Sequence, residues 1–193
     1  MHRIILIRHG EAAKSNTDAD PRLTELGQQQ AHELASWLDS EFPGGSGVKL
    51  VSSPKARALQ TAFPTADRWQ CEVREEPAVV EVPSPQGVGL AKRGHWIKQL
   101  LAGSWNTLEP AQQVWREGLI NYLKSHQDSN HHVSLVFCHF MVINAVVAAL
   151  RNDDKVAQFY PDYTSCTELA LKDGDLEIVK LGRERTQEKN RIQ

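Results

Sequence analysis

Two histidines in this sequence each lie two residues beyond the end of a short apolar segment, and an arginine precedes the first of them. Ile4–Ile7 is followed by Arg8 and His9, and Val133–Phe137 leads into His139. A neutral imidazole is a nucleophile near neutral pH, and a guanidinium offers planar donors to phosphate oxygens. Short continuous apolar runs are typical of buried central strands. Because ligands of open α/β sheets bind at the carboxyl ends of the strands, we expect these three side chains at one sheet edge.

A second arginine follows another apolar segment. Lys49–Ser52 is a candidate buried strand, and the residues after it begin with Ser-Pro, a pattern typical of a helix N-terminus. We therefore expect Ser53 to cap a helix over residues 56–69. Arg57 lies in the first turn of this helix, where free N–H groups and the helix dipole attract anions. Its guanidinium is predicted to point to the same edge as that of Arg8.

Two histidines and two arginines at one edge suggest a shared phosphate pocket. If the ligand is a phosphate ester, its hydrolysis also needs a proton donor for the leaving alkoxide. The best-placed carboxyl group is that of Glu81, in the irregular region 75–108, with Glu75 and Glu76 as rivals and Glu11 as a weaker candidate. A glutamate in a loop is most often only solvated, so the residues alone leave this assignment open.

Taken together and in this order, these segments resemble the histidine phosphatase superfamily, which has the phosphoglycerate-mutase-like fold. The segments that carry the resemblance are residues 8–11, 23–31 and 52–62, Glu81 and His139. The resemblance covers most of the chain. It implies that His9 is the nucleophile that accepts the phosphoryl group. It also implies that Arg8, Arg57 and His139 bind the phosphoryl oxygens and that Glu81 is the general acid.

These roles imply a phosphomonoesterase that needs no metal ion and no other cofactor. His9 attacks the phosphorus while neutral, and water then hydrolyses the phosphohistidine, with Glu81 acting first as acid and then as base. His139 works best as an imidazolium. We therefore expect the pKa values of the two histidines to be pushed apart.

Two positions depart from the pattern of this family. Its members usually have glycine after the second histidine, where this chain has Phe140. The backbone N–H of Phe140 stays available to phosphate, while its side chain narrows the pocket. Many members also carry a phosphate-contacting asparagine after the first motif, and Asn16 lies near that place. Phe140 and Asn16 are therefore included among the candidate phosphate-binding residues.

The substrate-clamping segments of true mutases have no convincing counterpart in this sequence. We therefore expect a phosphatase that acts on a small phosphorylated molecule. A phosphoglycerate mutase-like phosphotransferase and a catalytically weak phospho-ligand-binding protein are the alternatives.

Composition excludes several other classes of protein. The 193 residues carry a net charge of −2, which argues against nucleic-acid binding. Three cysteines without CxxC spacing favour the reducing cytoplasm. The apolar stretch 133–150 is interrupted by polar residues and predicts a buried strand and helix rather than a membrane span. His126, His131 and His132 have no accompanying carboxylate or cysteine pattern, so no metal site is predicted. The sequence indicates no oligomeric state.

The predicted secondary structure alternates between strands and helices. Thr24 caps a first helix that has Leu26 on its apolar face. The further elements expected are helices at 94–101, 110–125 and 141–150 and a hairpin of strands at 167–171 and 176–181. Val114 is among the inward positions of the second of these helices. We predict one three-layer α/β/α sandwich over residues 1–182, with a mostly parallel central sheet and one antiparallel edge, followed by a polar tail at 183–193.

The irregular region 75–108 is expected to act as a lid over the pocket, because long excursions in compact domains are usually functional. Lys92, Arg93, His95 and Trp96 lie within it, and their basic character suits an acidic or multiply phosphorylated substrate. A solvated segment with Trp96 packed beneath it is an equally good interpretation.

Overall fold

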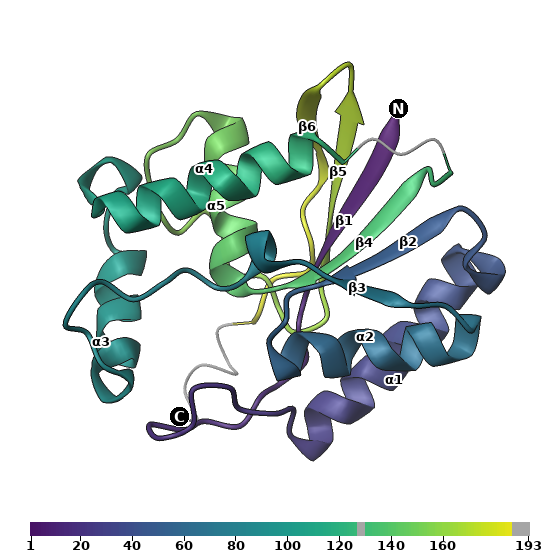
Figure 1. The fold of residues 1–193 in the computed structure, drawn as a ribbon, viewed down its shortest axis with the longest axis horizontal. Helices are drawn as coiled ribbons and strands as arrows, with labels where there is room; N and C mark the ends of the chain where they lie inside the picture. The colour runs from purple at the N-terminus through teal and green to yellow at the C-terminus, as the bar shows by residue number, and fades with distance from the viewer. Residues whose placement is uncertain (127–129, 187–193) are drawn as a thin grey trace.

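The computed structural model describes residues 1–126 and 130–186, and it contains a six-stranded sheet in the order β3-β2-β4-β1-β5-β6 (Figure 1). The strands are β1 His2–Arg8, β2 Val48–Ser52, β3 Val73–Glu75, β4 Val133–Cys138, β5 Cys166–Lys172 and β6 Asp175–Lys180. The first four strands run parallel, whereas β5 is antiparallel to β1. The prediction of a mostly parallel sheet with an antiparallel edge is confirmed.

Helices cover both faces of this sheet. They are α1 Glu25–Glu41, α2 Ala56–Trp69, α3 Leu90–Leu101, α4 Pro110–Lys124 and α5 Phe140–Arg151, with short 3-10 turns η1 Pro43–Gly45, η2 Pro77–Val79 and η3 Trp105–Thr107. Figure 1 shows α1 and α2 on one face, α4 and α5 on the other, and α3 beside the second pair. The three-layer α/β/α arrangement is therefore as predicted. Within the described residues, no helix is long and apolar enough to cross a membrane.

Alternate residues of β1 supply the two halves of the core. Ile4 and Leu6 belong to the cluster that contains the buried residues of α5, whereas Ile5 and Ile7 pack with residues of α1 and α2. Successive side chains of a strand point to opposite faces, so a strand covered on both sides reads as a continuous apolar run. Burial of each such side chain contributes about 1.5–3 kcal/mol.

The register between β1 and β4 brings the two histidines together. Arg8 pairs with Cys138, so His9 and His139 each follow a paired residue at the carboxyl ends of neighbouring parallel strands. The backbone N–H of His9 donates to the Cys138 carbonyl at 3.0 Å. Ser53 follows β2, the other neighbour of β4, and its N–H donates to that strand at 2.9 Å. Residues far apart in the chain thus meet at one edge.

The loop after β1 is held against the start of α1. Thr24 caps α1 as predicted, its Oγ1 accepting from the Gly27 N–H at 3.0 Å. A Cβ on Gly10 would lie only 2.7 Å from the Gly27 carbonyl oxygen, so both glycines are needed for this approach. Because Gly27 must face inward, Leu26 is turned outward and is 49% exposed. The prediction that Leu26 lies on the buried face is wrong.

Two other local predictions also differ from the structure. Val114 of α4 is exposed, because this helix packs on the core through Leu119 and Leu123. The helix expected at 94–101 begins earlier, at Leu90. This helix, α3, lines a cavity with Arg93, Ile97 and Leu101.

The start of the predicted tail packs against the loop that connects α5 to β5. Glu184 forms an isolated bridge with Pro161, and the Arg185 N–H donates to the Tyr160 carbonyl at 2.9 Å. The rest of the tail, 187–193, lies outside the described residues.

The close approach at Gly27 predicts that alanine changes the free energy of unfolding in opposite directions at Gly27 and at Gly118. Gly27→Ala is expected to lower the free energy of unfolding by about 1–3 kcal/mol or more, because the new methyl group overlaps the Glu11 carbonyl. Gly118→Ala is the control: this glycine is exposed on α4 with no atom near its added Cβ, and the change should add about 0.5–1 kcal/mol. Urea denaturation of both variants measures this, and equal stabilities would contradict the packing described.

Candidate active site

A cavity of about 560 Å³ opens at the carboxyl edge of the sheet. Its walls are formed by Arg8, Arg57, Glu81, Arg93, Ile97, Lys98, Leu101, Phe140, Met141, Tyr160 and Arg185. The lining thus combines one carboxyl group with five cationic side chains and an apolar wall. A volume of this order is typical of a site for a small molecule.

His9 lies beside this cavity, only 7% exposed, and its hydrogen bonds define its tautomer. Nδ1 lies 2.7 Å from the Gly10 carbonyl oxygen and must therefore carry the proton that it donates. Nε2 keeps its lone pair and accepts from Arg57 Nε at 3.3 Å. Burial, and then the charges of Arg8 and Arg57, hold the pKa of His9 well below its usual range. The ring is therefore neutral, and its free lone pair is on Nε2.

His139 is fully buried, and its ring centre lies 5.3 Å from that of His9. Its Nε2 is 2.8 Å from Ser53 Oγ, and its Nδ1 has no hydrogen-bond partner among the described residues. Burial, followed by the charge of Arg57, holds the pKa of His139 well below its usual range. Both pKa values are thus shifted in the same direction, so the imidazolium form expected for His139 is not the form of the free protein. Both imidazoles are surrounded by the same cations, so both are neutral.

Arg57 is brought to His9 by the first turn of α2. Its guanidinium Nη1 is 3.8 Å from an Asp20 carboxylate oxygen, and the same carboxylate accepts from the Ala56 N–H at 3.0 Å. The predicted cap by Ser53 is wrong, because Lys55 occupies the N-cap position and Asp20 supplies the acceptor from outside the helix.

Thr61, one turn further along α2, ties the two arginine-bearing segments together. Its hydroxyl donates to the Arg57 carbonyl at 2.7 Å and accepts from the Gly10 N–H at 3.0 Å. The position of the His9 loop is therefore coupled to that of Arg57.

Arg8 is held by one carbonyl and two aromatic rings. Its Nη1 donates to the Pro161 carbonyl at 2.8 Å, and its guanidinium carbon lies 4.2 Å from the centre of the Tyr163 ring and 5.2 Å from that of Phe140. Burial lowers the pKa of Arg8 to about 10, so the side chain stays charged near neutral pH. Phe140 thus packs against an anion-binding group as well as lining the cavity.

Glu81 is the carboxyl group that reaches the cavity. One of its oxygens accepts from the Val82 N–H at 3.0 Å, and the other accepts from the Met141 N–H at 3.4 Å. Burial raises its pKa and outweighs the opposing charges of Arg57 and Arg93. A raised pKa favours a protonated carboxyl group that can donate its proton.

The rival carboxyl groups face elsewhere. Glu75 is exposed at the end of β3, Glu76 accepts from the Ala78 N–H, and Glu11 accepts from Thr24 Oγ1 at 2.9 Å. None of the three lines the cavity.

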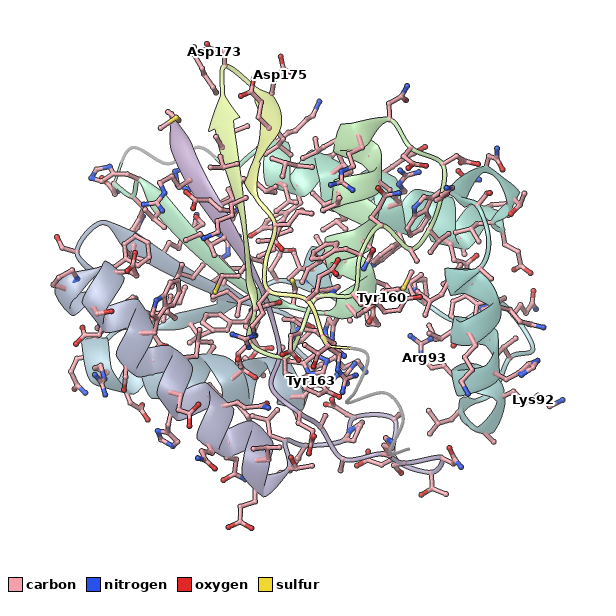
Figure 2. The ribbon with its side chains drawn as sticks, turned by 180° about the vertical axis from the view of Figure 1, so that it is seen from behind. Lys92, Arg93, Tyr160, Tyr163, Asp173 and Asp175 are labelled. Carbon is pink, nitrogen blue, oxygen red and sulfur yellow. The ribbon has the colours of Figure 1, made fainter. Side chains whose placement is uncertain are left out.

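Of the four residues expected in a lid, Arg93 alone lines the cavity. Its guanidinium donates to the Val82 carbonyl and to Ser84 Oγ, which fixes the segment beside Glu81. Figure 2 shows Arg93 on the side of α3 toward Tyr160, while Lys92 points outward. His95 is exposed, and Trp96 packs against the core, as the alternative interpretation of this region held.

Asn16 is exposed in the loop between β1 and α1 and does not line the cavity. Three aromatic or cationic residues that sequence reasoning missed do meet there or beside it: Tyr160, Tyr163 and Arg185. Each belongs to the loop after α5 or to the C-terminal segment, and no local pattern marks them.

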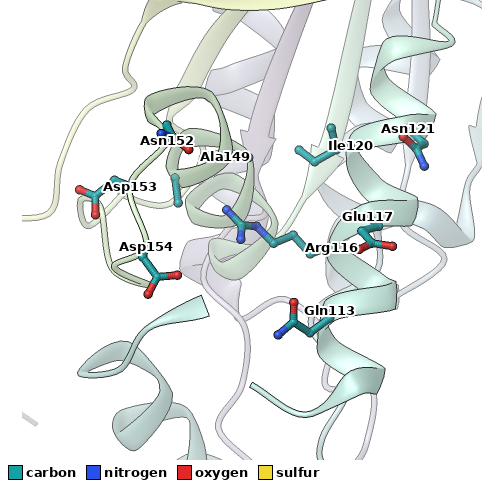
Figure 3. A pocket seen from close by; sticks show the side chains of 10 residues that line it. Gln113, Arg116, Glu117, Ile120, Asn121, Ala149, Asn152, Asp153 and Asp154 are labelled. Atoms are coloured by element: carbon teal, nitrogen blue, oxygen red, sulfur yellow. The ribbon is translucent and has the colours of Figure 1, made fainter. Parts of the chain in front are cut away.

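A second cavity, of about 580 Å³, lies between α4 and the end of α5 (Figure 3). Arg116 projects into it from α4 and lies over the Trp105 ring, 4.7 Å from its centre. Among the described residues, its walls contain no histidine, cysteine or serine. The described walls of this second cavity therefore offer no imidazole, thiol or serine hydroxyl.

The chain is thus an α/β protein with a cavity at the carboxyl edge of its sheet, and this cavity is lined mainly by cationic and apolar side chains. The family model of the histidine phosphatase superfamily (branch 1) matches residues 4–184, so the chain belongs to that superfamily. No curated protein sequence matches the chain significantly.

Solved structures with the same fold include several phosphatases. A mycobacterial glucosyl-3-phosphoglycerate phosphatase superposes with a TM-score of 0.71, at 20% identity over 96% of this chain and 100% of that one. Phosphoserine phosphatase of Entamoeba histolytica, solved with 3-phosphoglyceric acid, gives a TM-score of 0.72 at 24% identity, over 96% and 98% of the two chains. At these identities the similarity is one of fold.

The depressed pKa of His139 predicts a stability that falls in acid. The unfolded histidine binds a proton below about pH 6.5, whereas the folded one does not, so stability present above that pH is lost as the pH falls. Each such histidine contributes at most about 1.4 kcal/mol per pH unit. Urea denaturation at about pH 7.5 and about pH 5.5 should therefore show a smaller loss for His139→Asn than for the wild type. Equal losses would contradict the buried neutral state.

Proposed function

We propose that this protein is a metal-independent phosphomonoesterase that forms a phosphohistidine on His9. The observation that carries the proposal is the neutral Nε2 of His9, held beside the guanidinium groups of Arg8 and Arg57. Phosphoryl transfer depends mainly on positioning and on electrostatic stabilisation, and this arrangement supplies both. The substrate is a small phosphorylated molecule, in keeping with the cavity volume.

In the first step the phosphoryl group of the substrate displaces the hydrogen bond between Arg57 and His9. Arg57 and Arg8 bind its oxygens, and Nε2 of His9 attacks the phosphorus. The ester P–O bond breaks, and its electron pair goes to the leaving oxygen. Glu81 donates its proton to that oxygen, which leaves as an alcohol.

In the second step water attacks the phosphohistidine. Glu81, now a carboxylate, accepts a proton from the water, and the P–N bond breaks with its electron pair returning to Nε2 of His9. Inorganic phosphate leaves, and both residues regain their starting protonation states.

His139 changes its role when the anion binds. In the free protein the surrounding cations keep its ring neutral. A phosphoryl group brings nearly two negative charges, which favour the imidazolium form of a nearby histidine. His139 then donates to a phosphoryl oxygen, as Arg8 and Arg57 do.

Two other features support the proposal. The chain belongs to the histidine phosphatase superfamily, and structures with its fold include phosphatases for phosphoserine and for glucosyl-3-phosphoglycerate.

The proposed location is the cytoplasm, since Cys71, Cys138 and Cys166 are free thiols.

Replacing the nucleophile tests the proposal directly. His9→Ala is expected to lower kcat for para-nitrophenyl phosphate by at least about 10³-fold, because no phosphohistidine can form. The exposed His95→Ala is the control and should retain wild-type turnover. Chelator should leave wild-type activity unchanged, and quenching with detergent at alkaline pH should trap, in the wild type alone, a phosphoenzyme that acid then hydrolyses. A wild type without phosphatase activity at about pH 5–8 would refute the proposal and favour a phospho-ligand-binding protein.

The proton donor is tested by varying the leaving group. Glu81→Gln is expected to lower kcat/KM for an alkyl phosphate by about 10²–10⁴-fold, because an alkoxide leaves poorly without a proton. The loss for para-nitrophenyl phosphate should be much smaller, since nitrophenolate leaves unprotonated. Glu75→Gln, which changes an exposed carboxyl group, is the matched control. Equal losses with both substrates would exclude Glu81 as the general acid.

A further inference from the structure

Besides Arg93, two cationic side chains line the active-site cavity without taking part in the chemistry proposed above. Arg185 comes from the C-terminal segment, and Lys98 comes from α3. The Arg185 backbone is fixed by its hydrogen bond to Tyr160 and by the neighbouring bridge between Glu184 and Pro161. The guanidinium therefore lines the cavity from a segment whose backbone is fixed to the loop after α5.

The charge of Arg185 is only loosely compensated. Its guanidinium carbon lies 4.7 Å from the centre of the Tyr163 ring, and its buried Nε has no hydrogen-bond partner among residues 1–126 and 130–186. The nearest carboxylate is that of Asp162, at 3.9 Å, which is closer to Arg183, at 3.2 Å. The Nη groups of Arg185 donate no hydrogen bond within the described residues and remain available to an anion in the cavity.

The facing wall comes from α3. Arg93, Ile97 and Leu101 follow one another at intervals of a helical turn, so they share the face that lines the cavity. The two Nη groups of Arg93 are already bound to Ser84 and Val82. Lys98, in contrast, is exposed next to Ile97 and also lines the cavity.

We propose that Arg185 and Lys98 form a second anion subsite in this cavity. The subsite selects phosphomonoesters whose leaving group carries another negative group, a carboxylate or a second phosphate. This inference rests on the proposed function, because it assigns the phosphoryl group to Arg8 and Arg57 and the additional negative group of the substrate to Arg185 and Lys98.

The physical reason is the apolar lining of the cavity. Ile97, Leu101, Met141, Phe140 and Tyr160 line it with apolar surface. Charge–charge interactions are stronger beside such surface than in bulk water. A neutral leaving group would leave both cations uncompensated next to apolar walls, whereas an anionic one pairs with them. The cavity therefore selects against neutral leaving groups, which leave its cations unpaired, and also attracts anionic leaving groups.

Binding of matched ligands tests the subsite without turnover. The protein used is His9→Ala, and the dissociation constants of glycerol 3-phosphate and 3-phosphoglycerate, which differ by one carboxylate, are measured by calorimetry. Fructose 6-phosphate and fructose 1,6-bisphosphate form the second pair and add a phosphate. We expect the ligand with the additional anion to bind at least about tenfold more tightly in one of the pairs, and that pair identifies the anion.

Adding Arg185→Met to this protein should reduce the preference to less than about threefold. Lys98→Met, at an exposed position that does not endanger folding, should reduce it as well. Lys92→Met makes the same change in charge on α3 but outside the cavity, and it should leave the preference intact. No preference in either pair would overturn the subsite. An equal loss of affinity for both members of a pair in Arg185→Met would also overturn it, because Arg185 would then act on the phosphoryl group.

Failure of the subsite and failure of the proposed function give different results. Turnover of para-nitrophenyl phosphate by the wild type, combined with no preference between paired ligands, removes the subsite alone. A clear preference in a wild-type protein that hydrolyses no phosphomonoester removes the enzymatic function and keeps the two-anion site.

Discussion

The hydrogen-bond chain from Gly10 through His9 to Arg57 is the interaction on which the rest of the site depends. The Gly10 carbonyl fixes the proton on Nδ1 of His9, so the lone pair of Nε2 faces Arg57. Thr61 holds both ends of this chain through its bonds to the Gly10 N–H and the Arg57 carbonyl. The contact of Gly10 with Gly27 and the Thr24 cap of α1 position the loop itself. Helix α1 therefore positions the loop whose Gly10 carbonyl fixes the tautomer of His9.

Around this chain the protein gathers positive charge where water is scarce. His9, His139 and Arg8 all have pKa values lowered by burial, while burial raises that of Glu81. The same environment thus keeps the His9 ring neutral and shifts the pKa of Glu81 upward. A dianion entering the cavity compensates the clustered cations and changes the preferred charge of His139. In the proposed function, this electrostatic destabilisation of the free site is the source of its affinity for a phosphoryl group.

Local patterns in the sequence predicted most of the fold. Continuous apolar runs identified β1, β2 and β4, and Thr24 marked the start of α1, because these features depend on neighbouring residues. The errors arose where distant segments intervene. Leu26 is outward because the loop after β1 occupies the inner side of α1 at Gly27. Ser53 faces His139 and leaves the cap of α2 to Asp20.

The sequence by itself determined the family, the central strands and the identity of Arg8, His9, Arg57, Glu81 and His139 as candidates. Each lies within a short motif or directly after a buried strand, so its chemistry and its place at the sheet edge follow from local order. Only the tertiary structure decided which nitrogen of His9 is nucleophilic, which glutamate reaches the cavity, and that Arg185 joins it while Asn16 does not. These outcomes depend on strand register and on packing between segments far apart in the chain, where long-range contacts outweigh any local preference.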